Sequence, residues 1–174
     1  MCTIHLMVGI QGSGKTTFAK QLAIEKKIQL ISTDIIRETH PETPEKGIWP
    51  LAYQLCAEEL NQGRDVIFDA TSITPGVRSR LKEEVQHYCN AFDIGCYFFL
   101  PDLEVCKERV LLRNLLQTER HLPVEVVEQY YNRLIPPTIE EGFRFIKTMD
   151  IYGNCIQIAQ RLEENQQKRE DKND

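Results

Sequence analysis

One stretch of this sequence has the residue types and the spacing needed to hold a polyphosphate. Residues 9–16, GIQGSGKT, match the phosphate-binding loop pattern G-x-x-x-x-G-K-[ST] at every specified position. The glycines allow backbone N–H groups to converge on phosphate oxygens, and the N-terminus of a following helix adds about half a positive charge. Lys15 would reach the β- and γ-phosphates of a nucleoside triphosphate, and the hydroxyl of Thr16 would ligate Mg²⁺. The residues expected to bind the nucleotide are Gly12, Ser13, Gly14, Lys15, Thr16 and Thr17.

Asp34 is the first candidate for a catalytic base. It follows residues 28–32, a short apolar run typical of a buried strand, so it stands at the carboxyl end of that strand. Ligands bind at this edge of parallel α/β sheets, and a carboxylate there could accept a proton from an attacking hydroxyl. The structural alternative is a helix N-cap, a position at which Asp is preferred. The Asp-x-x-Arg spacing favours the base, because it places Arg37 one helical turn away on the same face.

Asp69 closes a further strand-like run, residues 65–69, and is a candidate magnesium contact. An apolar strand that ends in Asp is a signature of nucleotide hydrolases and kinases, in which the carboxylate approaches Mg²⁺ directly or through water. The alternative is that Asp69 caps a helix ahead of Thr71 and Ser72. The phosphate-binding loop elsewhere in the chain favours the metal role.

Three arginines in the second half of the chain could act on a transferring phosphoryl group. A helix predicted over residues 103–116 places Arg109 and Arg113 four residues apart on one face, with Arg120 just beyond its end. A guanidinium aimed at the phosphoryl oxygens stabilises charge that develops only in the transition state. This segment is therefore predicted to be a lid. The alternative is an ordinary surface helix whose arginines pair with neighbouring glutamates.

The elements that must position these groups alternate along the chain. Apolar patterning predicts strands near residues 4–8, 28–32, 65–69, 92–100 and 143–149, with helices between them. A closing helix is predicted over residues 154–162, where apolar residues recur at helical spacing. This order predicts the α/β class: a three-layer P-loop NTPase of the adenylate-kinase-like kind, with a central parallel sheet of about five strands and an arginine-bearing helical lid. We expect one domain over residues 1–162, the lid over about 102–135, and a charged tail at 163–174 that frays.

Length, charge and cysteine content limit the classes of protein to consider. A chain of 174 residues is of single-domain size. Its formal net charge of -5 argues against a protein that coats long stretches of nucleic acid, although holding a strand end needs only a few local cations. The six cysteines include no C-x-x-C pair and no Cys/His cluster at zinc spacing, so we expect reduced, mostly buried thiols. No segment is long and apolar enough to span a membrane, and we expect the cytoplasm as the location.

Five short strings stand in a fixed order along the chain. They are GIQGSGKT at 9–16, STDIIR at 32–37, VIFDAT at 66–71, Pro101 with CKER at 106–109, and EGFRF at 141–145. Together they resemble the kinase module of polynucleotide 5′-hydroxyl kinases, particularly that of the bacterial and phage repair enzymes. The resemblance covers residues 3 to about 150 and implies transfer of the γ-phosphate of ATP, or another nucleoside triphosphate, to the 5′-hydroxyl end of RNA or DNA, with Mg²⁺.

The resemblance also implies roles for individual residues. Asp34 matches the general base that acts on the 5′-hydroxyl, and Arg37 matches the arginine that holds a phosphate of the acceptor strand. Arg109, with Arg113 or Arg120, matches the lid arginines that clamp the donor phosphates. The residues predicted to act in catalysis are Lys15, Asp34, Arg37 and Arg109, and those predicted to hold the metal are Thr16 and Asp69.

Three classes of function remain open from the sequence. The first is the polynucleotide 5′-kinase. The second is a kinase of the same architecture that acts on a small hydroxyl compound, such as a nucleoside, sugar, antibiotic or aminoacyl-tRNA, because Asp34 as a base would serve any alcohol. The third is a nucleotide-binding switch without an external acceptor. A channel lined by Arg37 and by Arg78 or Arg80 would favour a nucleic-acid strand, and a closed pocket would favour a small acceptor.

Overall fold

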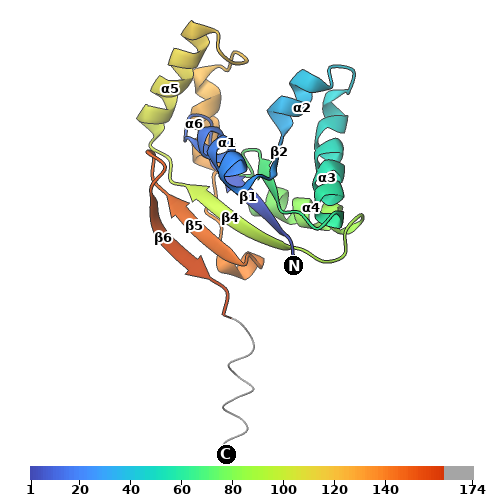
Figure 1. Cartoon of the computed structure of the whole chain (residues 1–174). Helices are drawn as coiled ribbons and strands as arrows, with labels where there is room; N and C mark the ends of the chain where they lie inside the picture. Colours follow the sequence, from blue (N-terminus) through green and yellow to red (C-terminus); the bar gives the residue numbers. More distant parts are fainter. Residues whose placement is uncertain (163–174) are drawn as a thin grey trace, which may run out of the picture.

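A six-stranded sheet in the order β2-β3-β1-β4-β5-β6 forms the centre of the computed structural model, which describes residues 1–162 (Figure 1). The first five strands pair in parallel, and β6 pairs antiparallel with β5. The carboxyl ends of these parallel strands, which the candidate residues follow or close, therefore meet at one edge of the sheet, its carboxyl edge. The strands are β1 (Thr3–Val8), β2 (Gln29–Ser32), β3 (Val66–Asp69), β4 (Asp93–Phe99), β5 (Phe145–Met149) and β6 (Cys155–Gln160).

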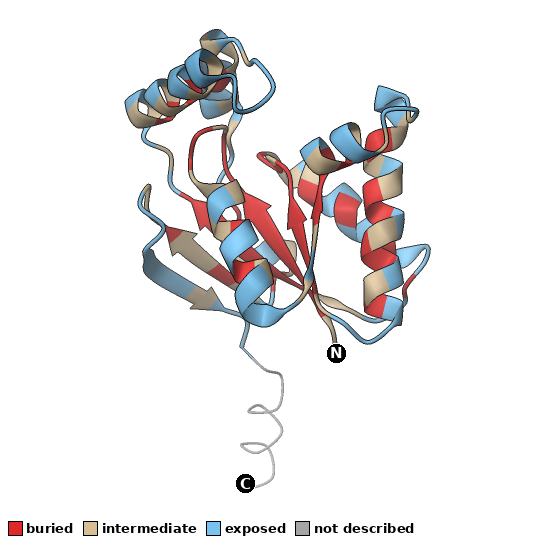
Figure 2. Cartoon of the chain, turned by 45° about the horizontal axis from the view of Figure 1, so that its top comes forward, coloured by how far each residue is buried: buried red, intermediate tan, exposed pale blue. Residues whose placement is uncertain are grey.

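Helices cover both faces of the central strands of this sheet, so the fold has three layers. On one face α1 (Lys15–Lys26) packs Ala19 and Leu22 against Met7 of β1. On the other face α3 (Glu45–Asn61) and α4 (Pro75–Gln86) pack against the alternate β1 side chains, including Ile4 and Leu6. Figure 2 shows the buried residues concentrated in the strands between these helices. This architecture confirms the predicted α/β fold class. Parallel strands that are enclosed on both faces have continuous apolar sequences, which is why they could be predicted.

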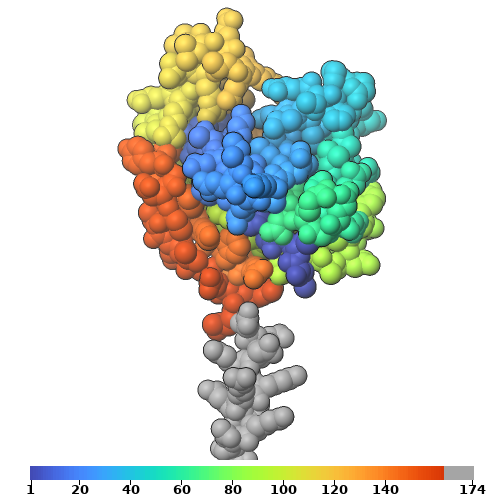
Figure 3. All heavy atoms as spheres, viewed as in Figure 1, coloured from blue at the N-terminus to red at the C-terminus, as the bar shows by residue number. Residues whose placement is uncertain are grey.

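Two helical segments extend past the carboxyl edge of the sheet. One contains α2 (Thr33–Thr39) and the start of α3, and the other is an arm formed by α5 (Leu103–Leu116) and α6 (Val124–Arg133) (Figure 1). The arm encloses a small apolar cluster of its own, in which Cys106, Val110 and Val127 pack against Ile10 of the phosphate-binding loop. In the space-filling view the surface is notched between the two segments, with residues of α1 at its base (Figure 3). The arm occupies the region predicted to be a lid.

The end of the described chain differs from the prediction. The helix expected over residues 154–162 is wrong, because residues 155–160 form β6 and pair with β5 in register Lys147↔Ile158. A tight turn makes this pairing possible: the carboxylate of Asp150 accepts hydrogen bonds from the backbone N–H groups of Tyr152 and Asn154, each at 2.9 Å. The spacing of the apolar residues around Ile158 is compatible with a helix and with a strand. Hydrogen bonding to β5 favours the strand. The fraying predicted for residues 163–174 lies outside the described residues.

Two composition-based expectations can be compared with residues 1–162. All six cysteines are free thiols, and four of them are buried. Burial raises the pKa of the Cys56 thiol far above its ordinary value, which makes this cysteine a packing residue rather than a nucleophile. No helix in this part of the chain combines the length and apolar character needed to cross a bilayer.

A short 3-10 helix, Ile139–Glu141, connects the arm to β5.

Candidate active site

The phosphate-binding loop joins β1 to α1 through two glycines with left-handed backbone. Gly12 has φ 78° and Gly14 has φ 95°, values that favour glycine. Gly12 also lies against α5: a Cβ atom at this position would stand 2.5 Å from the backbone oxygen of Cys106. Gly14 is the N-cap of α1, so the helix begins at Lys15 and its N-terminus faces the loop. The local sequence therefore produces the anion cradle that the motif predicts.

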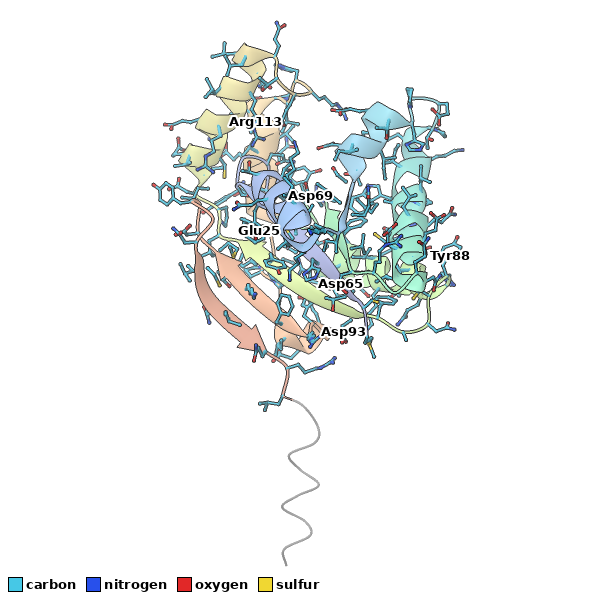
Figure 4. All side chains as sticks on the ribbon, in the orientation of Figure 1. Glu25, Asp65, Asp69, Tyr88, Asp93 and Arg113 are labelled. Atoms are coloured by element: carbon cyan, nitrogen blue, oxygen red, sulfur yellow. The ribbon has the colours of Figure 1, made fainter. Side chains whose placement is uncertain are left out.

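Three side chains of the predicted nucleotide and metal site meet at this cradle. The hydroxyl of Thr16 donates a 2.8 Å hydrogen bond to Oδ2 of Asp69, and Nζ of Lys15 lies 3.8 Å from Oδ1 of the same carboxylate. Asp69 is only 3% exposed, at the end of β3, and Figure 4 shows it beside α1 at the carboxyl edge. Thr74, not Asp69, caps the following helix α4, so the capping alternative for Asp69 is wrong.

Buried polar atoms without partners mark the same place. Oδ1 of Asp69, Oγ of Ser13 and Oε1 of Gln11 have no hydrogen-bond partner among residues 1–162. Most buried polar side-chain atoms in folded proteins are satisfied, so three unsatisfied atoms around one loop point to a polar ligand. Thr17, also predicted to contact the nucleotide, is exposed in the first turn of α1.

The donor set around this loop fits Mg²⁺ held together with a polyphosphate. A hydroxyl and a carboxylate are the oxygen ligands that Mg²⁺ prefers, and it commonly takes its other ligands from substrate phosphates and water. Residues 1–162 contain no group of three or more His, Cys, Asp or Glu side chains placed to hold a metal ion by themselves. Thr16 and Asp69 are therefore the residues available to share such an ion with a nucleotide.

Asp34 lies in the first turn of α2, beyond the end of β2. The N-cap of this helix is Ser32, whose hydroxyl accepts from the backbone N–H of Ile35 at 3.4 Å, so the N-cap alternative for Asp34 is wrong. The side chain of Asp34 is 79% exposed. Ser32 pairs in register with Asp69, and β3 separates β2 from β1. With strands about 4.8 Å apart, the ends of β2 and β1 lie about 10 Å from each other, on either side of Asp69.

Two carboxylates hold the guanidinium of Arg37. Nη1 donates to Oδ1 of Asp34 at 2.8 Å, while Nε and Nη2 donate to Glu45 at 3.1 and 2.7 Å. The hydrogen bonds from Arg37 lower the pKa of Glu45, and those to Glu45 raise the pKa of Arg37. The structure begins α3 at Glu45, and no motif signals this contact because the partners come from different elements.

The lid arginines occupy three different environments. Arg109 donates from Nη1 to the carbonyl oxygen of Gly12 at 3.2 Å and from Nη2 to that of Ile151 at 2.9 Å, so it lies against the phosphate-binding loop. Arg113 faces Glu119 at 3.6 Å, within the arm. Arg120 is exposed in the loop between α5 and α6, and its charge contributes to the lowered pKa of Glu45. Within residues 1–162, Arg109 is the one of these three arginines that hydrogen-bonds to the phosphate-binding loop.

Arg78 and Arg80, the two candidates for the acceptor channel, have opposite surroundings. Arg78 is 2% exposed and donates to the carboxylate of Glu141 and to the backbone oxygens of Ser72 and Ile135. These contacts make it a structural tie between α4 and the segment before β5. The side chain of Arg80 is 69% exposed and lines a cavity on the α3 and α4 side of the molecule.

Comparison with known families adds to this geometry. Residues 4–137 match the model of the AAA domain family AAA_33. The chain belongs to this family. The matched range contains the phosphate-binding loop, Asp34, Asp69 and Arg109, so the site lies wholly within the AAA domain. The domain has the fold of a P-loop kinase, which is a nucleotide-binding fold.

Individual relatives share this domain at low identity. The bifunctional polynucleotide phosphatase/kinase of Schizosaccharomyces pombe is 24% identical over 140 residues, which are 80% of this chain and 31% of the relative. The chain thus spans about a third of that protein's length. Two solved structures share the fold: a chain of the PezAT toxin-antitoxin system of Streptococcus pneumoniae, and a sugar kinase from Janibacter sp. HTCC2649. Their TM-scores are 0.70 and 0.64 and their identities 18% and 17%, with 91% and 88% of this chain and 71% and 87% of theirs covered.

Proposed function

We propose that this domain transfers the γ-phosphate of ATP, or of another nucleoside triphosphate, to a hydroxyl group, and that the acceptor is the 5′-hydroxyl end of RNA or DNA. One observation carries the proposal. The Asp34–Arg37 pair stands at the same sheet edge as the Lys15, Thr16 and Asp69 cluster, with about 10 Å between the two strand ends. That separation suits a terminal phosphate on one side and an attacking hydroxyl on the other.

In this proposal the chain's own residues act on an in-line displacement. Asp34 accepts the proton of the acceptor hydroxyl as its oxygen bonds to the γ-phosphorus, and the bond to the leaving nucleoside diphosphate breaks. Lys15 and the N-terminus of α1 hold the phosphates and offset the charge that they carry. A magnesium ion shared by Thr16 and Asp69 would neutralise further charge on the phosphate oxygens. Arg109, which donates a hydrogen bond to the Gly12 carbonyl of the loop, would take part in the same stabilisation.

Arg37 is suited to hold a phosphate of the acceptor strand. A guanidinium has five N–H donors, and paired donation to a carboxylate has the same geometry as paired donation to a phosphate. Glu45, which is exposed, can yield to an acceptor phosphate while the bond from Arg37 to Asp34 persists. The base and the phosphate contact would then be aligned by one side chain.

A polynucleotide end is the first candidate acceptor. The similarity to the polynucleotide phosphatase/kinase of S. pombe supports it, as do the five motif strings that span the domain. A net charge of -5 is compatible with this acceptor, because an end needs local cations such as Arg37 and Arg80 rather than a basic face. A small hydroxyl compound is the second candidate, since a sugar kinase shares the fold and Asp34 would serve any alcohol.

The deciding experiment is transfer of label from γ-labelled ATP to a panel of acceptors. The panel contains RNA and DNA oligonucleotides with a 5′-hydroxyl, the same oligonucleotides with a 5′-phosphate as matched controls, and nucleosides and sugars. We expect label on the 5′-hydroxyl oligonucleotides alone. Label on a sugar or nucleoside instead would favour the second candidate. Release of free phosphate at a rate that no acceptor changes would indicate a nucleotide-binding switch.

A further inference from the structure

A cavity of about 370 Å³ opens between α3 and α4, next to the Arg37–Glu45 pair. Trp49, Pro50, Tyr53 and Val77 supply apolar lining, and Lys46 and Arg80 supply positive charge. Its volume lies near the lower end of the roughly 300–1,000 Å³ that is usual for ligand pockets. The cavity therefore has room for one planar ring system and its sugar.

We propose that this cavity binds the nucleobase of the terminal nucleotide of the acceptor, by stacking against Trp49. The inference rests on the proposed function and specifies the recognition element of the same acceptor site. It assigns to α3 and α4 a role in substrate choice beyond covering the sheet.

Trp49 has the surroundings of a stacking platform. Its ring lies 5.8 Å from that of Phe68 and 6.1 Å from that of Tyr53, measured between centroids, while the residue is only partly buried and borders the cavity. Phe68 is fully buried in β3 and Tyr53 is 3% exposed, so the indole is supported by the core. A supported aromatic ring loses little conformational freedom on binding, and stacking tolerates any base.

Charge at the cavity suits a nucleic-acid strand. Arg80 has a side chain that is 69% exposed, and its Nε lies 3.8 Å from Glu84, too far for a hydrogen bond. Lys46 is also exposed. Lys46 and Arg80 bring two positive charges to the lining against the one negative charge of Glu45. The two cations are therefore available to phosphodiester groups while the apolar wall faces a base.

The position of the cavity follows from the helix that carries it. Trp49 comes four residues after Glu45 on α3, which places it about one turn, or about 6 Å along the axis, from the residue that holds Arg37. Arg37 in turn contacts Asp34 at 2.8 Å. A nucleotide whose 5′-hydroxyl faced Asp34 would thus have its base within reach of Trp49.

The protein carries its own reporter for this contact, because Trp49 is the single tryptophan of the sequence. We would titrate the wild-type protein with a 5′-hydroxyl oligonucleotide and with the same strand lacking only its 5′-terminal base. We expect the intact oligonucleotide to change the tryptophan fluorescence until the change saturates. We expect no change with the oligonucleotide that lacks the base. The KM of the intact acceptor should be lower by roughly tenfold or more, the scale of one stacked base.

Two variants test the same contact from the protein side. Trp49→Leu and Arg80→Ala are expected to raise the KM of the intact acceptor with little change in the KM of ATP. The matched control is Arg64→Ala, an exposed arginine that pairs with Glu59 at the other end of α3 and should leave both values unchanged. Because Trp49 also packs against Phe68, its replacement could disturb folding. The comparison of the two oligonucleotides on the wild-type protein tests the same contact without any variant.

The outcomes separate this inference from the proposed function. Equal KM values for both strands, with unchanged fluorescence, would overturn the base site and leave the polynucleotide kinase standing. A base-dependent fluorescence change without phosphoryl transfer would support the base site and overturn the kinase. Transfer only to small alcohols, with no response to either strand, would overturn both.

Discussion

Arg109 donates a hydrogen bond from Nη1 to the carbonyl oxygen of Gly12 across 3.2 Å, and so ties the α5–α6 arm to the phosphate-binding loop. Its second bond, from Nη2 to Ile151, reaches the turn between β5 and β6. The backbone of Cys106, about one turn earlier on α5, also lies against Gly12, since a Cβ atom added at Gly12 would stand 2.5 Å from the Cys106 oxygen. A displacement of this helix would therefore move the phosphate-binding loop, which gives the arm a direct physical connection to the proposed nucleotide site.

Replacing Arg109 by alanine is expected to lower kcat on the order of 10³-fold, by analogy with arginines that stabilise charge in phosphoryl transfer. The measurement is steady-state transfer from ATP to a 5′-hydroxyl oligonucleotide. Arg113→Ala is the matched control, since Arg113 pairs with Glu119 within the arm, and a loss below about tenfold is expected there. If the Arg109 variant also lost less than tenfold, its role would be confined to tying the arm to the loop.

Asp34→Asn should abolish transfer and leave ATP affinity nearly unchanged. The substitution keeps the size of the side chain but removes the carboxylate that would accept the proton, while Arg37 retains its bonds to Glu45. Transfer rate and ATP binding would be measured on the same preparation. Glu38→Gln, an exposed acid on the same helix, serves as control and should retain full activity. Near wild-type transfer by the Asp34 variant would remove Asp34 from the mechanism.

Lys15→Ala should impair ATP binding and turnover together. Lys15 has the cation nearest to the Asp69 carboxylate, at 3.8 Å, and is the motif residue expected on the donor phosphates. Calorimetric or fluorescence titration with ATP would measure the loss of affinity, expected to be at least tenfold for a charge-assisted phosphate contact. Lys20→Ala, an exposed lysine on α1, should bind as the wild type does. Undiminished affinity in the Lys15 variant would contradict its phosphate role.

Gly12→Ala should destabilise the fold as well as weaken nucleotide binding. The new Cβ would meet the backbone oxygen of Cys106 at 2.5 Å, and φ of 78° is unfavourable for alanine. The backbone strain alone is about 1–2 kcal/mol, and displacement of α5 adds to it. Urea denaturation would measure the loss. Gly76→Ala on α4 is the control, because a Cβ added there would have no atom within 4 Å, and a change below about 1 kcal/mol is expected.

His5 should make stability depend on pH. Burial lowers its pKa below the ordinary value, although a 3.1 Å contact with Asp65 opposes the shift. The unfolded chain then binds a proton at His5 more readily than the folded chain, so the unfolding free energy falls as pH drops through about 6.5. Urea denaturation at pH about 7.5 and about 5.5 should show a smaller fall for His5→Gln than for the wild type. His121→Gln, an exposed histidine, should follow the wild type; equal falls in both variants would exclude His5 as the cause.

The sequence alone determined the features whose cause is local. Residues 9–16 specify the loop because its glycines, lysine and threonine are contiguous, and buried parallel strands are recognisable as apolar runs. The prediction for residues 154–162 was wrong because a short apolar pattern allows helix and strand equally until a neighbouring strand offers hydrogen bonds.

Only the tertiary structure decided which charged groups face one another. Arg78 and Arg80 are two residues apart on one helix, yet one is buried against Glu141 and the other lines the Trp49 cavity. Glu45 reaches Arg37 because α3 begins beside α2, and Arg109 reaches Gly12 because the arm folds back onto the loop. These contacts join residues from separate elements, so their distances depend on how the elements pack rather than on any spacing along the chain.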